Sequence, residues 1–73
     1  MTGPDREVRA GQVWRHWKEG TYYFVVAVAR HSETLEEMVV YRRTNDSDEF
    51  WARPVNMWLD EARPGEKRFR RVR

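Results

Sequence analysis

Residues 21–30, Thr-Tyr-Tyr-Phe-Val-Val-Ala-Val-Ala-Arg, are the stretch that decides the fold. Most of these ten residues are aromatic or β-branched, and none is glycine or proline, which is typical of a β-strand. A buried helix could have the same apolar content, but the polar turns on both sides favour a strand. The nearly continuous apolar run indicates a central strand, or one that bends between two sheets of a small barrel.

Shorter strands are predicted on both sides of this stretch, at residues 11–17, 37–43, 49–53 and 68–73. The segments between them are polar turns, including the cluster at 44–48. Apolar residues at helical spacing predict one or two helical turns before the last strand, and they are Val55, Trp58, Leu59 and Ala62. This order predicts a mostly-β fold, a small five-stranded SH3-like barrel with one short helical turn before the last strand. We expect residues 1–9 to be a flexible N-terminus and residues 10–73 to form the single domain.

Aromatic side chains must stabilise a chain of this size, because it has 73 residues and no cysteine. Four Trp, three Tyr and three Phe are available, and each buries roughly 150–250 Å². The predicted core aromatics are Phe24, Tyr41, Phe50, Trp58 and Phe69. The chain could be a monomer, or a homodimer that adds buried surface.

The basic residues are concentrated at the C-terminus. Residues 67–73 contain five cations and no anion, whereas residues 1–66 contain nine basic and twelve acidic residues, a net charge of −3. The cations are Lys67, Arg68, Arg70, Arg71 and Arg73. They could bind a nucleic-acid backbone, or they could protect an edge strand from pairing with another chain.

The polar loop after the long strand is the least ordinary feature of the sequence. Arg30, His31, Ser32, Glu33 and Thr34 occur where a hairpin loop normally has Gly, Asn, Asp or Pro. Hydroxyls, an imidazole and a guanidinium together suit a polar or anionic ligand. The alternative is that Ser32 and Thr34 bond to their own backbone while Glu33 accepts from nearby amides.

Trp51 and Arg53 are two residues apart on a predicted strand and therefore share one face. On an outer face they could hold a planar ligand between ring and guanidinium. On an inner face Trp51 would be a core residue instead. The leading hypothesis is an uncharacterised, non-catalytic binding module in which the loop at 30–34 and Arg53 converge on one pocket for a polar or anionic ligand.

Catalysis, cofactors and membranes have little support in the sequence. His31 and Ser32 point to opposite faces of an extended backbone, so they do not easily form a nucleophile–base pair. His31 and Glu33 share a face and could form a base–orienter pair, but no nucleophile, oxyanion hole or cofactor motif accompanies them. His16, His31 and Glu33 could in principle hold a metal, but hydrogen-bonded histidines are the simpler interpretation. We therefore expect no catalytic residue, metal or cofactor, and a cytoplasmic protein without membrane contact.

The polar loop and four other motifs resemble the small bacterial family catalogued as domain of unknown function 1653. The motifs are Trp14-Arg15-His16-Trp17-Lys18, His31-Ser32-Glu33-Thr34, Val39-Val40-Tyr41, Trp51-Ala52-Arg53-Pro54 and Arg68-Phe69. The resemblance covers roughly residues 11–70 and implies an SH3-like barrel without an assigned activity. It also implies that the family's signature positions are His16, His31, Ser32, Glu33, Thr34, Tyr41, Trp51, Arg53 and Pro54.

Overall fold

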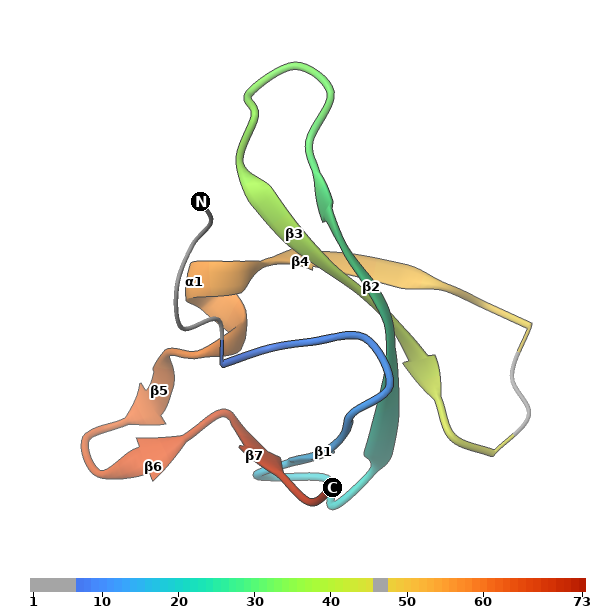
Figure 1. Ribbon diagram of the computed structural model, residues 1–73. Coiled ribbons are helices and arrows are strands. Elements are labelled where there is room, and N and C mark those ends of the chain that lie inside the picture. Colours follow the sequence, from blue (N-terminus) through green and yellow to red (C-terminus); the bar gives the residue numbers. More distant parts are fainter. Residues whose placement is uncertain (1–6, 46–47) are drawn as a thin grey trace.

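The longest strand, β2 (Tyr22–Arg30), is the middle strand of an antiparallel five-stranded sheet. The structure is a computed structural model and describes residues 7–45 and 48–73. The sheet has the order β4-β3-β2-β1-β7 and curves strongly (Figure 1). Its other strands are β1 (Val13–His16), β3 (Glu37–Arg43), β4 (Trp51–Pro54) and β7 (Phe69–Arg71).

A β-bulge bends β2, which pairs with β1 on one side and with β3 on the other. Pairing with β3 extends over nearly all of β2, but the register shifts between Val25 and Ala27. A bulge bends the strand that contains it and increases its twist. The predicted strand at 21–30 is therefore confirmed, both as a strand and as a central one.

The core lies on the concave face of the sheet. Residues directly opposite each other in paired strands share a face, and Trp14 opposes Tyr23 while Tyr41 opposes Val25. The short helix α1 (Val55–Trp58) closes this face with Trp58. The buried cluster consists of Val8, Trp14, Tyr23, Val25, Val39, Tyr41, Trp58 and Phe69.

A second, two-stranded sheet was not predicted from the sequence. β5 (Glu61–Arg63) and β6 (Glu66–Lys67) form a short hairpin around Pro64 and Gly65. The predicted helical turns reached Ala62, but α1 ends at Trp58 and the chain enters β5. Gly65 has a φ of +83°, which a hairpin turn of this kind favours.

The mostly-β prediction with one short helix is confirmed by this arrangement. β4 and β7 are the two edge strands of the five-stranded sheet. Among the described residues they do not pair with each other. Residues 46–47 of the predicted turn at 44–48 lie outside the described residues, as do residues 1–6 of the predicted flexible N-terminus. No helix in the described ranges is long and apolar enough to cross a membrane.

Three apolar residues differ from their predicted positions. Phe50 was predicted to be core, but it is 59% exposed because it precedes the first paired residue of β4. Phe24 is only half-buried, since it lies on the convex face opposite Arg42. Val8, which was not predicted to be a core residue, is fully buried.

Candidate functional site

The imidazole of His31 organises the predicted polar loop. Its Nδ1 atom accepts hydrogen bonds from the backbone N–H of Glu33, at 3.1 Å, and of Thr34, at 3.2 Å. The Thr34 hydroxyl oxygen in turn accepts from the N–H of Glu36 at 3.2 Å. The histidine therefore does for this turn what Asn or Asp does in many others. Glu33 meets the imidazole through its backbone and not through its carboxylate.

Arg30 and Leu35 complete the turn. Arg30 donates from Nη1 to the carbonyl oxygen of Leu35 at 3.0 Å, and Leu35 takes a left-handed φ of 66° where glycine is usual. Ser32 is exposed. The loop projects beyond the rest of the sheet (Figure 1, green), and most of its polar side chains bond to its own backbone.

The second histidine caps a turn in the same way. His16 ends β1, and its Nδ1 atom accepts from the N–H groups of Lys18 and Glu19, both at 3.3 Å. The two histidines are thus used alike at two different turns. In residues 7–45 and 48–73 no three His, Cys, Asp or Glu side chains gather as metal ligands.

Trp51 and Arg53 lie on the concave face, because Trp51 opposes Tyr41 and Arg53 opposes Val39. Trp51 is nevertheless 45% exposed, since it is the first residue of the edge strand β4. The Arg53 guanidinium carbon is 5.5 Å from the centre of the Phe69 ring. The Nε atom of Arg53 is buried and has no hydrogen-bond partner, which is an uncommon state for a charged donor.

A cavity of about 230 Å³ lies beside this arginine. Its lining residues are Glu19, Tyr23, Tyr41, Arg43, Trp51 and Arg53. No residue from 30–34 is among them, so the cavity that contains Trp51 and Arg53 does not include the predicted loop. We call this cavity the Arg53 pocket.

Three lining residues of the Arg53 pocket were not singled out from the sequence. Tyr23 and Arg43 oppose each other on β2 and β3, and Glu19 belongs to the turn that His16 caps. Tyr23 is part of an unbroken apolar strand and Arg43 ends an ordinary one. Their common face follows from the β2–β3 register, which the sequence pattern alone does not mark.

The region around His16 is electropositive. Burial lowers the pKa of His16, Glu19 raises it, and the nearby cations Arg53, Arg68 and Lys18 lower it again. The net shift is downward from 6.5. Arg53, Arg68 and Lys18 therefore lie close enough to His16 to oppose its protonation.

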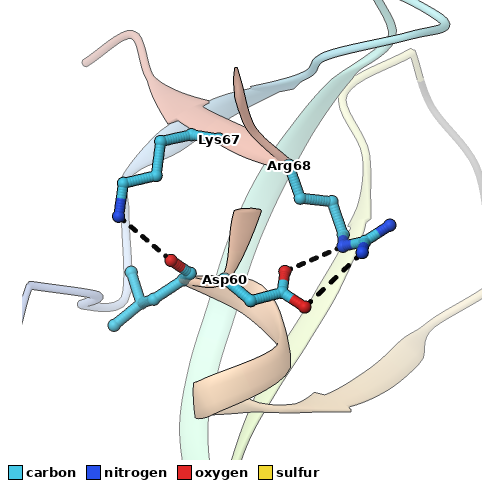
Figure 2. Close-up of polar contacts among 4 residues, drawn as sticks. Asp60, Lys67 and Arg68 are labelled. Atoms are coloured by element: carbon cyan, nitrogen blue, oxygen red, sulfur yellow. Dashed lines mark hydrogen bonds and ion pairs between the residues drawn. The ribbon is translucent and has the colours of Figure 1, made fainter. Parts of the chain in front are cut away.

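An ion pair balances part of this charge. Arg68 donates from Nε to the Asp60 carboxylate at 2.8 Å (Figure 2). Lys67 donates from Nζ to the carbonyl oxygen of Leu59 at 3.1 Å. The hydrogen bond from Arg68 lowers the pKa of Asp60. The Nε atom of Arg53, by contrast, donates to no carboxylate.

The five C-terminal cations do not form one surface. Lys67 and Arg68 make the contacts just described, and Arg70 lies 3.9 Å from Glu66. Arg70 and Arg71 point to opposite faces of β7, since Arg70 opposes Arg15 and Arg71 opposes Trp14. β7 is also an edge strand, and charge on an edge strand discourages pairing with another chain.

Lower pH is expected to destabilise the domain through His16. Because the folded-state pKa lies below the unfolded value near 6.5, the unfolded chain binds this proton more readily. The free energy of unfolding should therefore decrease as pH falls through about 6.5 towards the lowered native pKa. Chemical denaturation of the wild type and His16→Gln at pH 7.5 and 5.5 measures this, and an unchanged pH dependence in the variant would contradict it.

One comparison with known proteins supports the family resemblance. The sequence model of the family described as "Protein of unknown function (DUF1653)" matches residues 12–72. A comparison with curated proteins found no match, and a comparison with solved structures found none either. The match includes every strand, the helix and all residues of the Arg53 pocket. The chain therefore belongs to the DUF1653 family.

Proposed function

We propose that this domain is a non-catalytic binding module, and that the Arg53 pocket takes a small planar anion such as an aromatic carboxylate. The buried Nε atom of Arg53, which has no partner, carries the proposal. A guanidinium donor without a partner is costly inside a protein, and a bound carboxylate would supply the missing acceptor. Trp51 would stack on the planar part of the ligand.

The charges and size of the pocket support the same ligand class. Arg43 and Arg53 contribute two cations against one carboxylate, Glu19. The volume of about 230 Å³ suits one aromatic ring and its carboxylate, and it is below the range of typical drug-sized sites. Tyr23 and Tyr41 supply further aromatic walls.

The polar loop at residues 30–34 has a supporting part in this proposal. The hydrogen bonds of Arg30, His31 and Thr34 stay within the turn, so we infer that they hold the β2–β3 hairpin in shape. Of the site residues predicted from the sequence, we propose that Trp51 and Arg53 contact the ligand.

We also infer that the curved sheet is an SH3-like barrel in a bacterial cytoplasmic protein. Two structural features support the barrel: the five-stranded sheet curves strongly (Figure 1), and its last strand, β7, pairs with β1. The family resemblance supports the bacterial source. The lack of cysteine in 73 residues is compatible with a reducing compartment.

Nuclear magnetic resonance titration with nicotinate and nicotinamide tests the ligand class. These two compounds differ in charge and share one ring, so we expect nicotinate, but not nicotinamide, to shift the Trp51 indole N–H and Arg53 Nε–H signals. Arg53→Gln should weaken nicotinate binding about tenfold or more, since a charged hydrogen bond is worth about 1.5–3 kcal/mol.

Arg63→Gln is the matched control for the same loss of charge. Arg63 is exposed, and its guanidinium carbon lies 5.3 Å from the ring centre of Trp17; it is not a lining residue of the Arg53 pocket. Equal weakening by both variants, or equal responses to nicotinate and nicotinamide, would reject the proposed pocket. Melting curves of both variants confirm that the fold persists.

A further inference from the structure

The convex face of the sheet has a composition of its own. Strand register divides the paired residues into the concave core side and an opposite side, which we call the outer face. The outer face consists of Val13, Arg15, Tyr22, Phe24, Ala27, Ala29, Met38, Val40, Arg42, Ala52, Pro54 and Arg70. None of these twelve residues is buried.

Charge on the outer face has one sign. Arg15, Arg42 and Arg70 occupy three of its positions, and no carboxylate occupies any of them. Arg15 and Arg70 oppose each other directly on β1 and β7. Like charges in this position destabilise a sheet. Glu66, which lies 3.9 Å from Arg70, offsets part of this repulsion, and a bound polyanion would offset more of it.

Aromatic rings lie between these arginines. Tyr22 opposes Arg15 and is 47% exposed. Phe24 lies next along the face on β2, and the Arg42 guanidinium carbon is 5.2 Å from its ring centre. Proteins hold phosphates and stack bases with arginines that lie beside exposed rings.

A cavity of about 380 Å³ extends this surface towards the C-terminus. Its lining residues are Gly11, Val13, Phe24, Arg42, Thr44 and Arg73. Arg73 thereby adds a fourth cation beside Arg42. Of the basic C-terminal residues, Arg70 and Arg73 contribute to this side, whereas Lys67 and Arg68 bond to Leu59 and Asp60.

We propose that the outer face binds single-stranded nucleic acid. Arg15, Arg42, Arg70 and Arg73 contact successive phosphates, and a base stacks on Tyr22. A single strand fits better than a duplex, because only unpaired bases offer a free face to an exposed ring. An anionic membrane fits less well, because membrane-surface binding relies on large apolar side chains and the exposed outer-face residues here are arginines, alanines and one tyrosine.

Fluorescence anisotropy with labelled ten-nucleotide oligo-dT and oligo-U tests the charged contacts. We expect affinity to fall steeply with salt, and Arg15→Gln and Arg42→Gln each to weaken binding several-fold. Each variant should also reduce the slope of log affinity against log salt by about 0.7, the value for one lost phosphate contact on a single strand. Arg63→Gln is the control for loss of one charge elsewhere.

Arg43→Gln separates the outer face from the Arg53 pocket. Arg42 and Arg43 are neighbours in sequence, but Arg42 opposes Phe24 on the outer face and Arg43 opposes Tyr23 on the core side. Weakening by Arg42→Gln without weakening by Arg43→Gln supports the outer face. Weakening by Arg43→Gln without weakening by Arg42→Gln would place the oligonucleotide at the Arg53 pocket and overturn the inference. The nicotinate titration tests the proposed function independently of this result.

Tyr22 variants test the stacked base. Tyr22→Ala should weaken oligonucleotide binding about fivefold or more, the effect expected for loss of one stacked base, and Tyr22→Phe should retain it. Equal affinity of Tyr22→Ala and wild type, equal binding of a ten-base-pair duplex, stronger binding to phosphatidylserine vesicles, or no oligonucleotide binding at 50 mM salt would each overturn the inference.

Discussion

Trp58→Ala is expected to remove a large fraction of the domain's free energy of unfolding at 25 °C. The Trp58 side chain is fully buried, stacks on Phe69 with ring centres 3.9 Å apart, and meets Tyr41 at 4.8 Å and Trp14 at 5.8 Å. Truncating such a residue costs about 3–5 kcal/mol, and a domain of this length has a total stability of about 4–11 kcal/mol. Guanidinium denaturation followed by far-ultraviolet circular dichroism measures the loss.

Trp58→Phe and Trp51→Ala are the controls for this prediction. Phenylalanine keeps a ring against Phe69 and removes the Trp58 Nε1 donor, which is buried without a hydrogen-bond partner. We expect a smaller loss than for Trp58→Ala, because less buried volume is removed. Trp51 is 45% exposed, so its truncation should cost much less than that of Trp58. If Trp58→Ala were no less stable than Trp51→Ala, the proposed core would be wrong.

Local patterns predicted the strands best where one residue type dominated. β2 and β3 were found within one residue of their ends, because β-branched and aromatic residues dominate β2 and form the centre of β3. The β5–β6 hairpin was missed because residues 61–67 are mostly charged and carry no apolar alternation. Its pairing depends on Gly65 and on the bond between Arg68 and Asp60, which joins residues on either side of the hairpin.

Burial of single aromatics was harder to predict than strands. Phe50 and Trp51 are adjacent, and both lie at the open end of β4 rather than in the core. Their sequence neighbourhood resembles that of a buried strand residue. The exposure of these two side chains depends on where β4 begins to pair with β3. This pairing involves residues far apart in the sequence, so the local pattern does not reveal it.

The candidate site shows the same division between local and long-range information. The sequence drew attention to residues 30–34 because turn chemistry did not explain them, yet His31 supplies that turn chemistry through its imidazole. Arg53 was identified, but its neighbours Glu19, Tyr23 and Arg43 come from a turn and two other strands. The register of β2, β3 and β4 brings the strand residues together, and the turn between β1 and β2 supplies Glu19.

Gln12→Met should destabilise the domain by about 2–4 kcal/mol, because it removes an acceptor that two buried or half-buried donors share. The Gln12 Oε1 atom accepts from Trp14 Nε1 and from the Arg9 N–H, both at 2.9 Å, and a buried donor left without a partner costs about 1–3 kcal/mol. A double-mutant cycle with Trp14→Phe isolates the first bond. Since phenylalanine has no donor, Gln12→Met should cost less in that background, and strictly additive losses in urea denaturation would show that the Gln12–Trp14 bond contributes nothing.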